Sequence, residues 1–542
     1  MKPKILIIGG GVGGLSCATS LAETGKFDIS IYESDIIGGQ ASTKKSKLCN
    51  TEISWRVFLN FYYNLFKIID TIGAKNNFYS LKDTDYCISN KYSGRFRYTL
   101  INRLPLKELV KFLNLFLIST DRAINDYHNI TAIEYFNNNE LIKMLIGPYY
   151  GLDVKKATLS SFYKFSYNYF ENYGSHKISK FPTSDSLFIP WNKYLESLGV
   201  KIYEKHFINK IITDKNGKIK KVIINNGVYE GNEIIFANST QSLVDLFNKN
   251  NDLNKKIICK KLNILNTGRQ YYISVNFYWK RPIITTNECH IYTFANGWLP
   301  IILKRFINTD YVEKNCNKNI KEVWNISLAD NLLGNYVKKY TSQCSFEEIV
   351  YEIKMNIINS EHFKNYFDFE NNTWDDYFYD YEFDDRYEKQ LPTAYKFSIN
   401  KGIETNLLNN QEPELGNNIY FSAYYVKNTT GGAGMETSCE IGLTTADLIC
   451  KKYNIKNPRK PILRTKKYLT LLTYPLVLFD SLLYSLKMRP ITDFINPLIL
   501  LIIYFIIIVI ILVIIILFFI KIIITFSKNK KLKNIFNFLK SI

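Results

Sequence analysis

The order of apolar and polar positions predicts that the chain opens with a βαβ unit. Residues 5–8 form an uninterrupted apolar run, as expected of a buried parallel strand. Residues 15–24 have the apolar spacing of a helix, and residues 29–32 form a second short strand. Strand, helix and strand in this order predict an α/β fold with a parallel sheet.

The same periodicities predict further elements over the first 450 residues. Helices are expected at residues 59–72, 104–120, 141–150, 158–173, 190–198, 345–358 and 439–451. Strands are expected at residues 200–203, 207–213, 220–225, 233–237, 270–278, 291–303 and 418–425. Ser345 and Glu348 have the spacing of a capping box, whereas the acidic and aromatic residues 365–388 predict a solvated surface.

The C-terminal part of the chain has a different pattern. Residues 466–488 are rich in leucine with Pro475 inside, which predicts two short helices lying either at a membrane interface or on the catalytic body. Residues 498–520 then contain no charged side chain. At about 1.5 Å rise per residue, this segment exceeds the roughly 30 Å hydrocarbon core of a bilayer. We therefore expect a C-terminal transmembrane helix, a single-pass anchor that leaves the catalytic body in the cytosol.

Charge is concentrated in the same part of the chain. The 542 residues are 46% hydrophobic and carry a formal net charge of +20. Residues 451–542 hold 16 of the 69 basic residues and two of the 49 acidic ones, so the rest of the chain is only mildly basic. This distribution favours an anionic membrane surface as a partner, and no nucleic-acid partner is expected.

Cysteine and histidine give no sign of a disulfide framework or a metal site. The nine cysteines form no Cys-x-x-Cys pair, and the five histidines are dispersed. We therefore expect reduced, buried thiols and no bound metal.

The loop after the first strand carries the candidate chemistry. It has the spacing G-x-G-x-x-G, which makes its candidate cofactor-binding residues Gly9, Gly11, Val12, Gly13 and Gly14. Glycines allow a tight turn and a close approach of backbone to a pyrophosphate, which would lie at the N-terminus of the helix. Glu33 ends the second strand 19 residues after Gly14, where its carboxylate can accept hydrogen bonds from ribose hydroxyls. The alternative is an ordinary glycine-rich turn, but the ordered βαβ unit favours a dinucleotide site.

A second pair of glycines, Gly38-Gly39, follows Glu33 by five residues. This arrangement resembles the flavin amine oxidase and phytoene desaturase superfamily. The resemblance implies a Rossmann-like FAD-binding domain in which the second pair passes close to the FAD pyrophosphate. Members usually carry arginine after the pair, where this chain has Gln40, so Gln40 is a candidate contact that brings no charge.

The C-terminal FAD motif of the superfamily has a counterpart as well. Residues 431–438 and the helix after them resemble it, which implies cofactor contacts at Gly434, Met435 and Glu436. The helix N-terminus would stabilise a reduced flavin through its partial positive charge. One departure is Ala423-Tyr424, which stands where relatives have glycine and an acid.

Two more regions are assigned by the resemblance. Ile208 would meet the adenine through its backbone, and Ala237 would mark a strand end beside the dinucleotide. Relatives also have a segment similar to E-x-x-W-R-x-F, which makes Trp55 and Arg56 candidates for facing the flavin or the substrate. The alternative for that segment is an amphipathic helix with a buried tryptophan and a surface arginine.

These assignments predict a Rossmann-like FAD-binding domain interleaved with an α+β substrate domain. The FAD-binding domain would comprise residues 1–75, 181–250 and 396–452. A helical substrate or cap region would comprise residues 76–180, and the substrate domain residues 251–395. The remaining parts would be a basic amphipathic membrane-proximal segment, the transmembrane anchor and a basic tail, at residues 453–496, 497–526 and 527–542.

The function that the resemblance implies is oxidation of a substrate by FAD. A hydride would pass to the flavin from a hydrophobic small molecule, such as an isoprenoid or carotenoid-like lipid, and oxygen or a quinone would accept the electrons. One alternative is an amine oxidase for a soluble amine. Another is a flavin-binding membrane scaffold without turnover. No catalytic residue can be assigned from the sequence.

Overall fold

The computed structural model describes most of the chain. The described residues are 1–43, 46–50, 52, 56–81, 85–88, 93–95, 102–149, 154–171, 176–249, 261, 269–270, 272–283, 291–305, 309–329, 332–364, 367, 373–383, 396–397, 408–412, 415–430, 434–463 and 468–528. Trp55 and residues 431–433 lie outside this set, and so does most of the predicted basic tail.

A five-stranded parallel sheet forms the first layer. Its order is β19-β11-β1-β2-β7, and its strands are Ile419–Phe421, Glu233–Phe236, Lys4–Ile8, Asp28–Tyr32 and Lys201–Tyr203. The central strand β1 is apolar because the sheet buries it, and Ile5 and Ile7 have no exposed surface. The predicted Rossmann-like α/β fold is therefore confirmed.

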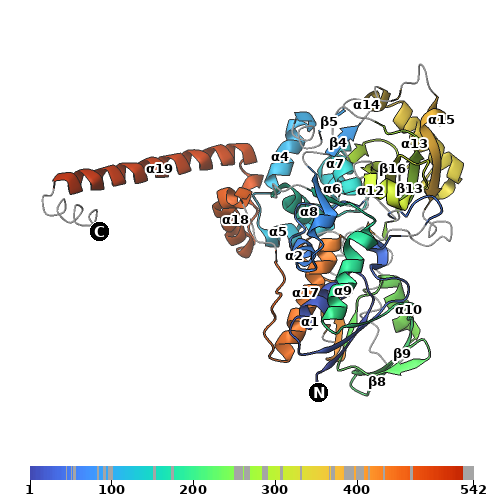
Figure 1. Ribbon diagram of the computed structural model, residues 1–542. Helices are drawn as coiled ribbons and strands as arrows, with labels where there is room; N and C mark the ends of the chain where they lie inside the picture. The colour runs from blue at the N-terminus through green and yellow to red at the C-terminus, as the bar shows by residue number, and fades with distance from the viewer. Residues whose placement is uncertain are drawn as a thin grey trace. The chain divides into compact units, whose positions relative to one another are not determined.

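Two helices pack closely against each other beside this sheet. α1 (Val12–Ala22) and α17 (Met435–Lys452) lie side by side in Figure 1. A Cβ at Gly442 would lie 2.4 Å from the Gly13 carbonyl oxygen, and a Cβ at Gly13 would lie 2.1 Å from the Ser422 oxygen. Only glycine permits these approaches, so Gly13 serves helix packing.

A seven-stranded sheet forms the second main layer. Its order is β17-β13-β16-β15-β14-β4-β5, and its strands are Phe378–Phe383, Tyr272–Trp279, Glu322–Ala329, Ile301–Arg305, Ile291–Phe294, Asp85–Ile88 and Ser93–Arg95. One face packs on α13 (Phe346–Ile358) through a core rich in aromatic side chains. The predicted capping box of α13 is confirmed, because Ser345 and Glu348 hydrogen-bond each other's backbone.

Two expectations about this region are wrong. Residues 291–303 do not form one strand, because a turn at Asn296–Leu299 folds them into the hairpin β14–β15. Residues 365–388 are not wholly a solvated surface. Phe367, Trp374 and Tyr377 are buried in the aromatic core, which outweighs the acidic residues between them.

Smaller elements complete the described part of the chain. The minor strands are β3 (Phe78–Leu81), β6 (His176–Ser179), β8 (Ile208–Thr213), β9 (Ile219–Ile224), β10 (Gly227–Tyr229), β12 (Arg269–Gln270) and β18 (Lys396–Phe397). The α-helices are α2 (Tyr63–Thr71), α4 (Leu106–Asn114), α5 (Thr120–Asn125), α6 (Ala132–Tyr135), α7 (Glu140–Met144), α8 (Leu159–Glu171), α9 (Ile189–Ser197), α10 (Thr240–Lys249), α12 (Thr309–Asn315), α14 (Glu361–Lys364) and α15 (Trp374–Tyr377). Short π-helices are η4 (Leu145–Tyr149) and η5 (Ser184–Phe188), and the 3-10 turns are η1 (Gly39–Ala41), η2 (Lys75–Asn77), η3 (Tyr127–Asn129), η6 (Thr341–Gln343) and η8 (Ile491–Asp493).

A second compact unit consists of residues 105–122 and 472–542. Within it, the Arg122 guanidinium donates to the buried Asp480 carboxylate at 3.0 Å. The predicted break at Pro475 is wrong, because α18 (Tyr468–Ser485) continues through it.

The predicted membrane anchor is also wrong. Residues 498–520 are helical, within α19 (Pro497–Lys528). Yet across the residues that the structure describes, no helix combines the length and the apolar character needed to cross a membrane. The predictions of a single-pass anchor and of the localisation derived from it are therefore wrong.

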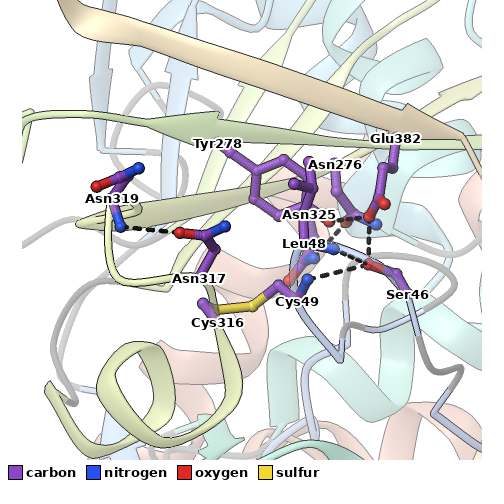
Figure 2. Close-up of a disulfide and its surroundings, with 10 residues drawn as sticks. All are labelled: Ser46, Leu48, Cys49, Asn276, Tyr278, Cys316, Asn317, Asn319, Asn325 and Glu382. Carbon is purple, nitrogen blue, oxygen red and sulfur yellow. Dashed lines mark hydrogen bonds between the residues drawn. A yellow bond between two sulfur atoms is a disulfide. The ribbon is translucent and has the colours of Figure 1, made fainter.

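One pair of cysteines departs from the expected reduced state. Cys49 and Cys316 form a disulfide, which Figure 2 shows between the segment after Gly38-Gly39 and the end of α12. Their backbones are paired, with Asn317 N donating to Leu48 O at 2.8 Å. A separation of 267 residues hides this pairing from the sequence.

Candidate cofactor site

The first glycine loop is built so that its backbone can approach a ligand. Gly9 has φ +115°, and a Cβ there would lie 2.7 Å from the Ala237 carbonyl. A Cβ at Gly14 would lie 2.1 Å from the Gly9 oxygen. At Gly11, by contrast, no heavy atom of the described residues other than Gly11 and its two chain neighbours lies within 4 Å of the Cβ position. Gly11 precedes Val12, the first residue of α1, so this open space lies at a helix N-terminus suited to phosphate.

Glu33 lies at the end of β2 beside this loop. Gly10 N donates to its Oε2 at 2.7 Å, and Asp35 N donates to its Oε1 at 2.9 Å. Burial raises the pKa of the Glu33 carboxyl, although these two N–H groups oppose the shift. These bonds hold the acid and the loop together; the contact of Glu33 with ribose hydroxyls stays a prediction.

The second glycine pair lies against the first. Gly38 N donates to Gly10 O at 2.9 Å. A Cβ at Gly39 would lie 3.5 Å from the Cα of Gly11. Gly38 and Gly39 have φ values of +105° and +54°, a region that favours glycine. The loop Gly9–Gly14 and the pair Gly38-Gly39 lie about 25 residues apart in the sequence. Together they form one glycine-lined surface, which we call the cofactor cradle.

Arg56 and Gln40 lie next to this cradle. Arg56 donates through Nη2 to the Gln40 carbonyl oxygen at 3.3 Å, and its Nε lies 3.6 Å from Glu52 Oε2. The Gln40 side chain is exposed. Arg56 is buried beside the glycine pair and is not the surface arginine of the alternative interpretation. Its neighbour Trp55 lies outside the described residues.

Asn238, which follows Ala237 at the end of β11, is a candidate site residue that was not predicted from the sequence. Ala237 N donates to Ile8 O at 2.7 Å, so this strand end lies beside Gly9. The contact of Ala237 with a dinucleotide stays a prediction. Both polar side-chain atoms of Asn238 are buried and find no partner among the described residues. Buried amides are normally satisfied, so this orphaned pair indicates a ligand. Its position directly after an apolar strand was the available signal.

In the C-terminal motif, Glu436 holds the start of α2, and its predicted cofactor contact stays a prediction. Its Oε1 accepts from Asn64 N at 3.0 Å, and its Oε2 accepts from Leu65 N at 3.0 Å. Glu436 thus satisfies the first N–H groups of α2 from the first turn of α17. Gly434 is the N-cap of α17, and a Cβ there would lie 2.9 Å from the Tyr62 hydroxyl. The cofactor contacts of Gly434 and Met435, and of Ile208 at the start of β8, stay predictions.

Comparisons with known proteins agree with this geometry. The profile of the NAD(P)-binding Rossmann-like domain matches residues 7–72. The chain is 24% identical over 269 residues to zeta-carotene desaturase of Synechocystis sp., covering 42% of this chain and 54% of that relative. It is 32% identical over 150 residues to zeta-carotene desaturase of Solanum lycopersicum, covering 27% of this chain and 24% of that relative. The structure of cyclohexylamine oxidase from Brevibacterium oxydans matches with a TM-score of 0.60 at 10% identity, covering 84% and 100% of the two chains.

The chain thus contains an NAD(P)-binding Rossmann-like domain, is similar to zeta-carotene desaturases over part of its length, and shares its fold with a solved amine oxidase. It spans about half the length of the Synechocystis relative and about a quarter of the Solanum one. At 10% identity, the likeness to cyclohexylamine oxidase shows the fold alone. Within this Rossmann-like fold, the open space at Gly11, the Glu33 carboxylate and the orphaned Asn238 amide fit a dinucleotide of the flavin type.

Proposed function

We propose that the protein is an FAD-dependent oxidoreductase that removes a hydride from a hydrophobic substrate, an isoprenoid or carotenoid-like lipid. The observation that carries the proposal is the glycine-lined space where Gly11 and Gly39 approach each other. Two glycine segments of this kind, with an acid at the end of β2, match what a pyrophosphate and a ribose require.

The chain's own residues would hold FAD at defined points. The N–H groups at the start of α1 would bind the pyrophosphate, since they have no partner within the helix. Glu33 would accept from ribose hydroxyls, and its fixed position beside Gly10 orients it for that task. When bound, FAD supplies the hydride acceptor, while positioning by the protein contributes the remaining rate acceleration.

The lipid substrate is supported by the relatives, which are named zeta-carotene desaturases. Oxidation of such a substrate would remove a hydride from one C–H carbon and a proton from the neighbouring carbon, which leaves a double bond, and oxygen or a quinone would finally accept the two electrons. The aromatic and apolar character of the chain suits a hydrophobic molecule. The solved amine oxidases share the fold, so oxidation of a soluble amine is the second candidate.

The deciding experiment follows the visible spectrum of the purified protein under anaerobic conditions. We expect a flavin absorbance band that is bleached by an isoprenoid or carotene and recovers on adding oxygen or a quinone. Bleaching by polyamines but not by lipids would favour the amine oxidase. A flavin that no compound in the panel reduces would favour a scaffold, and no flavin band with no stabilisation by added FAD would refute the proposal.

A further inference from the structure

Arg56 holds the backbone that follows the second glycine pair. Its side chain is buried, and its Nη2 donates to the Gln40 carbonyl oxygen at 3.3 Å. Gln40 lies in η1 (Gly39–Ala41), the turn that begins directly after Gly38. Because a buried guanidinium costs free energy unless it finds partners, its place against this loop is specific.

Glu52 fixes the orientation of Arg56. Glu52 is buried, with 1% of its surface exposed, and its Oε2 lies 3.6 Å from Arg56 Nε. Its Oε1 accepts from Thr183 N at 2.7 Å and from Thr183 Oγ1 at 2.8 Å. Thr183 is the N-cap of η5 (Ser184–Phe188). The buried carboxylate therefore ties the guanidinium to an element far along the chain.

The same element, η5, also packs directly on the glycine loop. Thr43 N donates to Ser184 Oγ at 2.8 Å, and Ser184 N donates to Thr43 Oγ1 at 3.0 Å. A Cβ at Gly38 would lie 2.6 Å from the Phe188 ring. Ser184 and Phe188 thus support the loop that Arg56 holds.

A loop that contains two glycines benefits from such support. Gly38 and Gly39 both have positive φ values, +105° and +54°. Glycine has more conformational freedom in an unrestrained chain than any other residue, and fixing the backbone of one residue costs about 1–2 kcal/mol. When a loop is ordered before its ligand arrives, binding does not bear that cost. The contacts of Arg56 and η5 should therefore raise the affinity for a ligand that the loop holds.

We infer that Arg56 is a positioning residue for the pyrophosphate of FAD. Through the Gln40 carbonyl it keeps the second glycine pair in the conformation that faces Gly11. The inference rests on the proposed function and deepens it at the same site. The resemblance places an arginine directly after the glycine pair, where this chain has Gln40. Here the arginine that serves the loop lies 16 residues further along the chain and acts on the backbone.

The role of Arg56 is one of geometry and not of charge. Arg56 and Glu52 form a buried ion pair without net charge, so their fields largely cancel at the distance of the cofactor cradle. Loss of the pair should therefore weaken FAD binding by the same factor at low and at high salt. An arginine that acted on phosphate through its charge would contribute less as salt is added.

The test compares FAD with riboflavin, which lacks the pyrophosphate and the adenosine. The full chain without bound flavin is titrated with each, and binding is followed by flavin fluorescence. The double variant Glu52→Gln/Arg56→Met leaves no unpaired buried charge. We expect its affinity for FAD to fall about tenfold and its affinity for riboflavin to stay within about twofold of the parent value. Unchanged FAD affinity would overturn the inference, and so would an equal loss for both ligands, which marks a merely structural role.

Arg56→Lys decides the matter if the double variant fails to fold. It keeps a cation beside Glu52, but one ammonium group cannot replace a guanidinium that meets both Glu52 and the Gln40 carbonyl. We expect a melting temperature close to that of the parent and the same loss of FAD affinity, about tenfold. A variant that keeps the full preference for FAD over riboflavin would show that charge alone suffices, which would overturn the inference.

The pair of Arg459 and Glu23 provides the matched control. Arg459 Nη2 lies 2.6 Å from Glu23 Oε1, and Glu23 is the C-cap of α1, at the opposite end of that helix from Gly11. Glu23→Gln/Arg459→Met should lower the melting temperature and leave the ratio of FAD to riboflavin affinity unchanged. A selective loss of FAD affinity in this control would overturn the inference, because any broken ion pair would then have the effect.

The outcomes separate this inference from the proposed function. A parent protein that binds FAD, with Arg56 variants that bind it as tightly, refutes the positioning role alone. A loss of affinity that shrinks as salt is added also refutes that role alone, because it assigns the effect of Arg56 to charge. A parent protein that binds no FAD refutes the proposed function.

Discussion

At Gly11, an added side chain should weaken cofactor binding without disturbing the fold. Beyond Gly11 and its chain neighbours, no heavy atom in the described part of the chain lies within 4 Å of a Cβ built there, and its φ of −75° is open to any residue. We expect Gly11→Ala to fold with an unchanged melting temperature as apoprotein. Its methyl group would occupy the space of the pyrophosphate, so FAD affinity should fall at least about tenfold, or 1.4 kcal/mol. Flavin content per protein and the stabilisation by added FAD check this.

Gly14→Ala is the comparison for that variant. Its Cβ would lie 2.1 Å from the Gly9 oxygen, so it should destabilise the apoprotein as well as the complex. A Gly11→Ala protein that keeps full flavin content would contradict the assignment of the cradle. An apoprotein destabilised as much as Gly14→Ala would show that Gly11 serves the fold.

His362 gives the second prediction at this scale, a dependence of stability on pH. Burial, with the nearby Lys304 charge, lowers the pKa of His362 from 6.5 to about 4. Between these values the unfolded chain binds more protons than the folded one, so stability is full above pH 6.5 and is lost as pH falls toward 4. At about 1.4 kcal/mol per pKa unit, the loss would reach at most about 3.5 kcal/mol. His362→Gln should flatten urea-unfolding stability across that window, and His128→Gln should not.

At the scale of elements, Glu436 joins the N-termini of α17 and α2. Its carboxylate accepts from the backbone N–H groups of Asn64 and Leu65, which no helical carbonyl can satisfy. Glu436→Ala would leave these buried donors unpaired, so we expect the free energy of unfolding to fall by about 2–3 kcal/mol. Glu436→Gln keeps one acceptor and should recover part of the loss. Chemical denaturation checks both.

The control for that series is Glu347→Ala, an exposed acid in the first turn of α13. It should change the free energy of unfolding by less than about 0.5 kcal/mol. If Glu436→Ala is equally mild but reduces flavin content, the role first predicted for Glu436, cofactor contact, would replace helix capping.

The elements that the sequence predicts well are those fixed by local patterns. The apolar run of β1, the glycine loop and the acid of β2 lie within one short unit, so their spacing alone implies their contacts. The Ser345 cap is local for the same reason. Where an outcome depends on distant partners, the sequence fails. Glu436 meets Asn64 across 372 residues, and Asn238 is recognised only when its buried amide is seen to lack a partner among the described residues.

The composition of a segment also gave a wrong prediction of burial where packing between distant segments decides it. Trp374 and Tyr377 lie in an acidic stretch, and their burial follows from a core assembled by β13, β16 and α13. The polar alternation of β13 is visible in the sequence, but alternation usually marks a solvated face. That Ser274 and Asn276 are buried on that face requires the structure, because the cover comes from other parts of the chain.

At the scale of the whole molecule, the Cys49–Cys316 disulfide joins two distant parts of the fold. Cys49 lies in the segment that leads from Gly39 to Arg56, beside the cofactor cradle. Cys316 follows α12, next to strand β16 of the seven-stranded sheet. A link across 267 residues removes much conformational freedom from the unfolded chain. Its stabilising effect should therefore be large and should vanish on reduction.

We expect reduction by a dithiol to lower the free energy of unfolding of the parent protein by about 2–5 kcal/mol. The double variant Cys49→Ser/Cys316→Ser should be destabilised by a similar amount and should not respond to the dithiol. Cys344→Ser, which removes a free thiol, should behave as the parent does. Denaturation with and without reductant measures the three cases, and alkylation followed by mass spectrometry counts the thiols that reduction releases. A parent protein that releases none, and whose stability ignores the dithiol, would show that the two cysteines are reduced; their paired backbones at Leu48 and Asn317 would then hold the two segments together without a covalent bond.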